Sequence, residues 1–218
     1  MISIGNDIIA LQLINPERTK QEKFYSKILN EQELFLFNQK LFNKLPFEYF
    51  IWLAWSVKES VYKFHKRNNP DLAFSPTKII IKKVELPTQQ NVFCFDNAMH
   101  ENISFKTEEC YCCEINFNGE TIYARSFIGN QIIFTVANNS NWFDNVYWGI
   151  KMIESDVYAH QSKAVREFVL SKLNKLYPGN NVEIQKSKAG YPYIEEHKHL
   201  PLSFTHHGNF VAYAFARH

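Results

Sequence analysis

The sequence predicts an α+β protein built from two similar lobes. Its predicted strands and helices occur in runs and do not alternate strictly, which favours antiparallel sheets packed against helices over a parallel α/β fold. Each half begins with a strand, continues through a long helix and ends in a hairpin of similar character, at residues 122–137 and 200–216. The Asn- and Ser-rich run 138–141 is the one stretch that resembles a boundary. We therefore expect a first lobe at residues 1–138 and a second at residues 139–218.

The first elements of the chain are a strand and two helices. Residues 1–11 are expected to form a short buried strand, and residues 17–29 a helix with its apolar residues on one side. Asn30 is expected to cap the next helix, at residues 31–42. Glu33 stands at the position that completes a capping box with this residue.

The longest predicted helix runs from Pro46 to about Arg67. Proline suits the first turn of a helix. Lys58 lies on the border of the apolar stripe of this helix, where a lysine can extend its ammonium group outward while its stem stays packed. The stripe recurs with the 3.6-residue helical period and consists of Phe47, Phe50, Ile51, Ala54, Val57, Val61 and Phe64.

Strands dominate the remainder of the chain, with one further helix predicted at residues 162–176. The pairs Asn118-Gly119 and Gly129-Asn130 are plausible hairpin turns. The predicted strands lie at residues 78–86, 102–105, 110–117, 121–127, 131–137, 145–153, 181–186, 191–195, 200–206 and 210–216.

The composition is that of a folded protein without a dominant charge. The chain has 218 residues, of which 45% are hydrophobic, and a formal net charge of +2. Neither disorder nor a basic nucleic-acid-binding face is indicated. The longest apolar run, residues 49–55, is far shorter than the roughly 20 residues of a membrane span. Without an evident secretory leader, we expect a cytoplasmic protein that binds neither nucleic acid nor membrane.

The four cysteines do not suggest a disulfide framework or a zinc site. Three of them lie within four residues, and the adjacent Cys112 and Cys113 would point to opposite faces of a strand. A second paired cluster, which zinc requires, does not occur in the sequence. We therefore expect reduced cysteines buried on strands.

Asp7 and the long helix carry the first group of side chains suited to chemistry. Asp7 stands late in the first strand, and Glu59 and Lys63 are spaced i, i+4 on the helix. Alone, such an aspartate often caps a turn, and such a pair is often a surface pair worth about 0.3–0.5 kcal/mol. The presence of Trp55 and Tyr62 on the same side argues against a purely solvated face. Mg²⁺ takes one or two protein carboxylates, a number that Asp7 and Glu59 would supply.

A second group lies at residues 202–208, close to the C-terminus. Thr205, His206 and the amide of Gly208 would offer hydroxyl, imidazole and backbone donors within one turn, which suits a phosphate. A histidine at a hairpin tip is more often merely solvated. The glycine patterns of a P-loop, a dinucleotide-binding fold and a serine hydrolase do not occur in the sequence.

Taken together, these motifs resemble those of the 4'-phosphopantetheinyl transferase superfamily. This family carries a G-[IV]-D strand, a W-[ST]-x-K-E-[AS]-x-x-K helix and a G-K-P…S-H-[ST] hairpin. The chain has G-N-D at residues 5–7 and W-S-V-K-E-S-V-Y-K at residues 55–63. It has G-Y-P at residues 190–192, followed by T-H-H at residues 205–207.

The order of the motifs resembles the holo-acyl-carrier-protein synthase type, whereas the length resembles the two-lobed surfactin type. The resemblance covers about residues 1–86 and 158–216, and residues 87–157 carry no family signature. It implies two lobes related by pseudo-twofold symmetry, each an antiparallel sheet packed with a long helix. A complete site within one chain then becomes possible, and we expect a monomer.

The resemblance implies transfer of the 4'-phosphopantetheine group of coenzyme A to a serine of an acidic apo carrier protein, releasing adenosine 3',5'-bisphosphate. Glu59, Lys63 and Asp7 would be catalytic, and Asp7 and Glu59 would hold Mg²⁺. The residues expected to bind coenzyme A are Lys58, Lys63, Lys163, Lys172, Thr205 and His206.

Several positions depart from the family pattern. Ile9 and Ala10 stand where many members have an acid, Asn6 replaces an apolar residue, Tyr191 replaces a lysine and His207 replaces a hydroxyl residue. The missing acid favours one alternative, a non-catalytic homologue that binds coenzyme A or a nucleotide in a regulatory or scaffold role. A second alternative is an interaction protein without a ligand, in which the charges of the long helix are surface charges.

Overall fold

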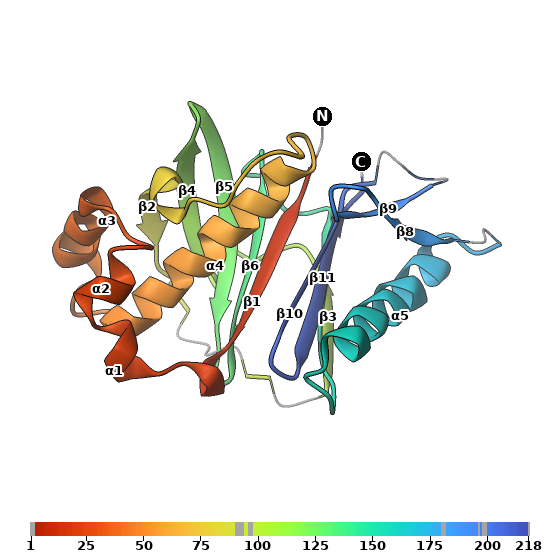
Figure 1. Cartoon of the computed structure of the whole chain (residues 1–218), viewed down its shortest axis with the longest axis horizontal. Helices are drawn as coiled ribbons and strands as arrows, with labels where there is room; N and C mark the ends of the chain where they lie inside the picture. The colour runs from red at the N-terminus through yellow and green to blue at the C-terminus, as the bar shows by residue number, and fades with distance from the viewer. Residues whose placement is uncertain are drawn as a thin grey trace.

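Two antiparallel sheets form the framework of the molecule (Figure 1). The computed structural model describes residues 3–89, 94–95, 98–179, 182–195, 197 and 200–217. The first sheet has five strands in the order β1 (Gly5–Ala10), β6 (Ile132–Asn138), β5 (Glu120–Ile128), β4 (Tyr111–Phe117) and β2 (Ile80–Glu85). The predicted α+β class, with antiparallel sheets and helices, is confirmed.

The second sheet has four strands and receives one of them from the middle of the chain. Its order is β10 (Leu202–His207), β11 (Phe210–Ala216), β7 (Val146–Met152) and β3 (Met99–Ile103). β3 precedes residue 138 but pairs with β7, so the sheets do not divide the chain cleanly at that residue. The division into two lobes with pseudo-twofold symmetry stays a prediction.

A separate two-stranded ribbon, β8 (Ile184–Lys186) and β9 (Pro192–Ile194), follows the second long helix. The hairpin between β4 and β5 turns at Asn118 and Gly119, which both have positive φ, as a primed hairpin turn requires. The second expected turn, at Gly129-Asn130, joins β5 to β6, and the amide of Gly129 donates to the carbonyl of Ile132.

The helix expected at residues 17–29 is interrupted. After the short 3-10 helix η1 (Leu11–Leu13), the chain forms α1 (Pro16–Thr19) and α2 (Glu22–Tyr25). Gln21 between them has extended backbone angles. The Thr19 hydroxyl, which accepts a hydrogen bond from the indole N–H of Trp52 at 3.0 Å, ties the end of α1 to the long helix. The prediction of one continuous helix was therefore wrong.

The capping box predicted at Asn30 is confirmed. The Asn30 side chain accepts from the amide of Glu33, and the Glu33 carboxylate accepts from the amide of Asn30, both at 3.0 Å. α3 (Glu31–Leu36) continues as a π-helix, η2 (Phe37–Leu41). The remaining helices are α4 (Phe47–Lys66), η3 (Pro76–Lys78) and α5 (Tyr158–Leu176). No described helix is long and apolar enough to cross a membrane.

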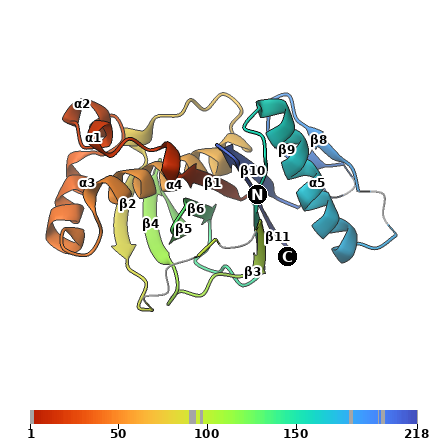
Figure 2. The ribbon, with the colours of Figure 1, turned by 90° about the horizontal axis from the view of Figure 1, so that it is seen from below.

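Three apolar cores follow from this layering (Figures 1 and 2). One lies between α4 and the outer face of the first sheet and includes Val57, Val61 and Ile115. A second lies between the inner faces of the two sheets, and a third lies under α5 on the second sheet. The sheets thus bury both faces, which explains the nearly continuous apolar sequence of β6 and β11.

The edge strands of the two sheets, β1 and β10, lie side by side and form what we call the seam. The amide of Asn6 donates to the Ser203 hydroxyl at 3.1 Å, and the amide of Ala10 donates to Nδ1 of His207 at 3.0 Å. Both pairs are 197 residues apart in the chain, so the strands run in the same direction. Side chains of β10 therefore satisfy backbone donors of β1 that a ladder would otherwise satisfy.

Gly5 allows α4 to approach β1 closely. A Cβ atom placed on Gly5 would lie 1.9 Å from the carbonyl oxygen of Ser60 and 2.7 Å from the amide nitrogen of Phe64. Because both atoms belong to helix backbone, α4 and β1 would have to separate to accept any side chain. Gly5, the first residue of the G-N-D motif, therefore sets the distance between β1 and α4.

We predict that Gly5→Ala destabilises the protein by about 2–3 kcal/mol through this overpacking. Urea unfolding followed by circular dichroism would measure the change. Gly119→Ala is the control, because its Cβ would meet nothing within 4 Å and only its φ of +82° is unfavourable, which costs about 1 kcal/mol. Equal losses in the two variants would contradict the steric explanation.

Candidate functional site

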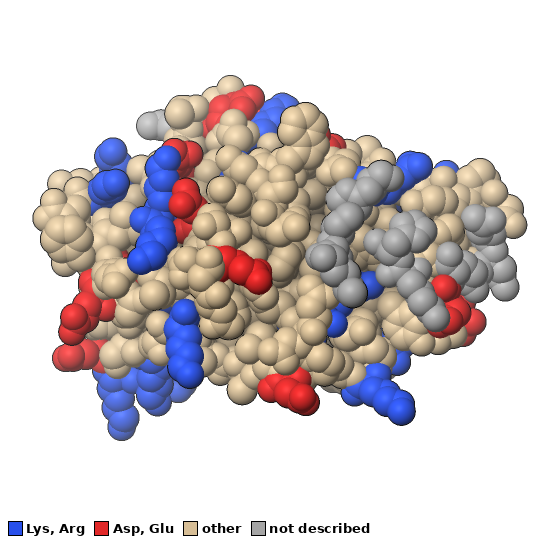
Figure 3. Space-filling view, turned by 90° about the horizontal axis from the view of Figure 1, so that it is seen from above, with Lys and Arg blue, Asp and Glu red and all other residues tan. Residues whose placement is uncertain are grey.

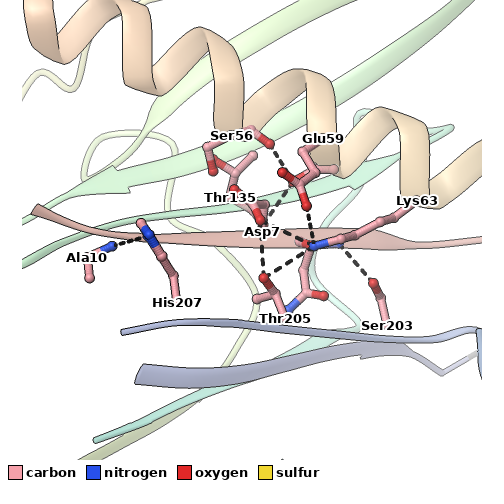
Figure 4. Close-up of polar contacts among 11 residues, drawn as sticks. Asp7, Ala10, Ser56, Glu59, Lys63, Thr135, Ser203, Thr205 and His207 are labelled. Atoms are coloured by element: carbon pink, nitrogen blue, oxygen red, sulfur yellow. Dashed lines mark hydrogen bonds and ion pairs between the residues drawn. The ribbon is translucent and has the colours of Figure 1, made fainter. Parts of the chain in front are cut away.

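The candidate site lies where β1, α4 and β10 meet (Figure 4). Alternation along β1 places Gly5, Asp7 and Ile9 on the face toward α4. Asp7 is 3% exposed and its side chain points at the helix face that carries Glu59 and Lys63 (Figure 4). The first two sequence motifs are thus brought together by the packing of α4 on β1.

The Lys63 ammonium group contacts all three elements. Its Nζ donates to the Asn6 carbonyl at 3.0 Å and to Oδ1 of Asp7 at 3.2 Å, both on β1. It donates to the Thr205 hydroxyl of β10 at 3.2 Å and forms an ion pair with Oε1 of Glu59 at 3.2 Å. Sequence analysis predicted Lys63 as a site residue, and in the structure it lies at the centre of the group.

Thr205 completes a triangle with Asp7 and Lys63. Its hydroxyl donates to Oδ1 of Asp7 at 3.1 Å while accepting from Lys63. Asp7 and Thr205 are 198 residues apart in the chain. Thr205 of the predicted hairpin therefore lies in one cluster with the predicted carboxylates Asp7 and Glu59.

The cluster perturbs the ionisation of both charged partners at its centre. Burial raises the pKa of Asp7 from an ordinary 3.8 to about 7; the Lys63 ammonium group lowers it in part, and the Glu59 carboxylate raises it further. Burial alone would lower the pKa of Lys63, but the charges of Asp7 and Glu59 outweigh it and raise that pKa. Lys63 therefore stays charged, while Asp7 gains its proton near neutral pH.

His206 and His207 have different surroundings on β10. The His206 ring lies 5.3 Å from the Tyr158 ring at the start of α5, in an edge-on arrangement. Burial, followed by the charges of Lys63 and His207, lowers the pKa of His206, so it is neutral at pH 7. His207 accepts the amide of Ala10 through Nδ1, and burial lowers its pKa as well. His207 thus attaches β10 to β1 at the seam.

Lys58 does not lie at the site, and its predicted role toward coenzyme A is corrected. Its side chain is fully buried, and its Nζ lies 2.6 Å from both Oε2 of Glu33 and the carbonyl oxygen of Ile28. Glu33 is itself fully buried and also accepts the amide of Ile81 in β2 at 2.9 Å. The border position on α4 faces the capping box of α3, a neighbour that helical periodicity alone does not reveal.

The two predicted lysines of α5 are not brought to Lys63 by any described contact. Lys163 is exposed and pairs with Glu167 at 3.7 Å on the same helix. The Nζ of Lys172 lies 5.9 Å from the centre of the Tyr147 ring on β7. Their role in binding coenzyme A stays a prediction.

Sequence reasoning missed a cavity beside Lys63. It has a volume of about 230 Å³ and lies between the end of α4, the turn at residues 189–192 and β10. Lys66 and Arg67 line it, together with Tyr191. The Arg67 guanidinium lies 5.2 Å from the Tyr191 ring centre. The run Lys63–Arg67 signalled a basic helix end, but only the packing shows that it borders a cavity.

The residues fit a divalent cation. Oδ2 of Asp7 is buried and has no hydrogen-bond partner, while Glu59 is close enough for its charge to raise the pKa of Asp7. A divalent cation would relieve this repulsion between two carboxylates. The described residues hold no group of three or more His, Cys, Asp or Glu side chains suited to a metal, and Ile9 and Ala10 are buried in apolar cores. Within this cluster, Asp7 and Glu59 are the two carboxylates that could contact such a cation.

Comparison with known families identifies the first half of the chain. The family model of the 4'-phosphopantetheinyl transferase superfamily matches residues 3–114, which include β1 and α4. The chain belongs to this superfamily. No curated protein and no solved structure gives a significant match. Membership supports phosphopantetheinyl transfer as the type of reaction. β10 lies outside the matched residues.

We predict that Asp7→Asn stabilises this transferase at pH 8. The pKa of Asp7 is higher in the folded state than in the unfolded state. The free energy of unfolding therefore falls as the pH rises from about 3.8 to about 7, because ionised Asp7 is unfavourable in the folded protein. An asparagine stays neutral, and its advantage should be on the order of 1–3 kcal/mol at pH 8 and vanish near pH 4. Denaturant unfolding across this pH range would test it, with exposed Asp71→Asn as control. A pH-independent difference would refute the linkage.

The buried position of Lys58 gives a second prediction. Lys58→Met leaves Glu33 as an uncompensated buried charge, so we expect a loss of about 3–5 kcal/mol in the free energy of unfolding. The matched control is Lys163→Met, which removes an exposed pair and should change stability by less than about 0.5 kcal/mol. Urea unfolding measures both variants. If Lys58→Met were as stable as the control, the ion pair would not support α4.

Proposed function

We propose that the chain transfers the 4'-phosphopantetheine group of coenzyme A to a serine of an acidic apo carrier protein, in an Mg²⁺-dependent reaction that releases adenosine 3',5'-bisphosphate. The observation that carries the proposal is the convergence of Asp7, Glu59 and Thr205 on the Lys63 ammonium group. Carboxylates, a lysine and a hydroxyl donor around one point suit a metal-bound diphosphate.

Asp7 and Glu59 would hold Mg²⁺. The unpartnered Oδ2 of Asp7 and the partly exposed Glu59 leave oxygen atoms for this role. When bound, Mg²⁺ supplies charge neutralisation and orientation of the diphosphate. Asp7 must be ionised to act as a ligand, so its pKa of about 7 implies that metal affinity falls as the solution becomes acidic.

Lys63 would stabilise negative charge on the diphosphate. Its raised pKa keeps it cationic, and its contacts with Asn6 and Thr205 hold the ammonium group at the seam. A charge held in place before the reaction needs little reorganisation when the transition state forms. Glu59, 27% exposed in its side chain, would accept the proton of the carrier serine as general base.

Thr205 and His206 would bind phosphate oxygens as neutral hydrogen-bond donors. The lowered pKa of His206 leaves an N–H donor without positive charge at pH 7. The cavity lined by Lys66 and Arg67 opens beside Lys63 and is better placed than Lys163 or Lys172 for a further phosphate of coenzyme A. Lys163 and Lys172 would bind its 3'-phosphate only if the coenzyme extends to α5.

We propose that the site is complete in one chain and that the protein is a monomer. The support is that β1, α4 and β10 of the same chain supply every residue of the cluster. Acidic and basic side chains are interspersed on the face shown in Figure 3, with no continuous basic stripe visible there. This surface suits a protein partner better than a polyanion. Sizing chromatography would contradict the monomer if it gave an obligate trimer.

We predict that Glu59→Gln and Glu59→Ala reduce transfer by about 100-fold or more, because each removes a metal ligand and the general base. Intact mass of a panel of apo carrier proteins, after incubation with coenzyme A and Mg²⁺, measures the product. Glu120→Gln, at the exposed first residue of β5, should leave the rate unchanged. Turnover in the Glu59 variants equal to that of the wild type would overturn the assignment.

Calorimetry and intact mass of the same purified protein distinguish the transferase from a non-catalytic homologue. The lack of an acid at Ile9 and Ala10 is the observation that favours that alternative. If the chain is a non-catalytic homologue, calorimetry with coenzyme A should show binding that does not depend on Mg²⁺. In that case no carrier protein of the panel gains mass. Metal-dependent binding together with transfer supports the enzyme.

A further inference from the structure

A pair of cysteine thiols lies on the inner face of the first sheet, apart from the site at the seam. Cys110 and Cys112 both belong to the core between the two sheets, and their Sγ atoms are 3.9 Å apart in a hydrogen-bonding contact. All four cysteines are free thiols. The prediction that all are buried was wrong for Cys94, which is exposed.

Arg125 on β5 stands directly opposite Cys112 on β4. It is 4% exposed, donates to Asn141 and to the carbonyl of Ala124, and lies over the Phe143 ring. Its Nε is buried without a hydrogen-bond partner, and no described carboxylate forms an ion pair with it. Lys83 and, to a smaller extent, the charge of Arg125 lower the pKa of the exposed Glu85 carboxylate, without an ion pair between Arg125 and Glu85. A buried guanidinium that lacks a close counter-charge is costly, so an anion at Cys112 would compensate it.

The neighbours of Cys112 have opposing effects on its pKa, and the net effect lowers it. The hydrogen bond from Cys110 lowers the pKa of Cys112 to about 7, burial opposes this effect, the Arg125 charge lowers it further and Glu85 of β2 raises it. The pKa of Cys110 is raised by its bond to Cys112 and by burial. Cys113 faces the opposite core, where burial raises its pKa to about 12. Of the three, Cys112 is therefore the thiol that ionises most easily near neutral pH, although while protonated its Sγ also donates to the carbonyls of Cys110 and Thr107 at 3.7 and 3.9 Å.

We propose that Cys112 and Cys110 form a redox-active dithiol that is oxidised to an intramolecular disulfide by low-molecular-weight disulfides. The Cys112 thiolate attacks one sulfur of the oxidant and displaces a thiolate, which leaves Cys112 in a mixed disulfide. The Cys110 sulfur then attacks the Cys112 sulfur and expels the second thiolate, which takes up the Cys110 proton. Cys110 and Cys112 lose two electrons, and the oxidant is reduced to two thiols.

The local backbone permits the bond to close. A disulfide needs an S–S distance of about 2.05 Å, so the two sulfurs must approach from 3.9 Å. Cys110 precedes the first paired residue of β4, Tyr111, and follows a turn at residues 107–109. It can move without breaking the β4–β5 ladder. Cys112 is 8% exposed and Cys110 is fully buried, which makes Cys112 the thiol that meets the oxidant.

The first test is incubation of the purified full chain with glutathione disulfide, followed by intact mass and peptide mapping. All variants carry Cys94→Ser, which removes the exposed thiol, and the parent chain with this change alone should lose the mass of two hydrogen atoms. Cys113→Ser is the matched control on the opposite face of the same strand and should lose it as well. Cys110→Ser should stop at one glutathione adduct on Cys112, and Cys112→Ser should form neither product at this pair.

Three outcomes would overturn the proposal: a parent chain that keeps its Cys110 and Cys112 thiols, a Cys113→Ser variant that no longer forms the disulfide, or a Cys110→Ser variant that still does. In a chain that keeps Cys94, a disulfide that joins Cys94 to Cys110 or Cys112 would also count against the pair. Added dithiothreitol should restore both thiols.

A second measurement tests the role of Arg125 without requiring oxidation. The rate of Cys112 alkylation by iodoacetamide should rise with pH around a midpoint near 7 in the Cys94→Ser background. Arg125→Lys keeps a positive charge and should retain this midpoint within about one pH unit, whereas Arg125→Met should move it toward the ordinary thiol range near 8.5 or above. An unchanged midpoint in folded Arg125→Met would show that Arg125 does not stabilise the thiolate.

Discussion

The Lys63 ammonium group is the point through which the long helix and the edge strands of both sheets are connected. It reaches the Asn6 carbonyl and the Asp7 carboxylate on β1, the Thr205 hydroxyl on β10 and Glu59 on its own helix. The seam lacks a regular backbone ladder in the described chain, so side chains such as Ser203 and His207 satisfy its donors. Edge strands joined in this way leave polar groups directed at the junction, and such groups can serve a ligand.

The buried position of Asp7 lowers the stability of the folded protein when this carboxyl group is ionised. One of its oxygens also has no hydrogen-bond partner. The surrounding structure compensates elsewhere: Gly5 brings α4 against β1, and the three cores bury both faces of each sheet. A buried carboxylate held on a well-packed scaffold has the preorganisation that the proposed metal site would need.

Three buried or half-buried cations show different solutions to the same electrostatic problem. Lys58 has a fully buried carboxylate, Glu33, and acts in the packing of α3, α4 and β2. Lys63 has two carboxylates that a bound cation would share. Arg125 has carbonyl and amide partners and a thiol opposite it. The three cations therefore differ in their partners: Lys58 has a carboxylate within the core, Lys63 has the carboxylates of the proposed site, and Arg125 has polar partners and lies opposite the proposed redox thiol.

The sequence by itself determined the features that depend on neighbours a few positions away. These are the capping box of α3, the i, i+4 pair of α4, the turn at Asn118-Gly119 and the order of the family motifs. Tertiary structure decided the pairing of β3 with the second sheet, the burial of Lys58 and the meeting of Lys63 with Thr205, which are 142 residues apart. Helical and strand periods assign a side chain to a face, but only the packing of sheets and helices determines which distant group lies opposite that face.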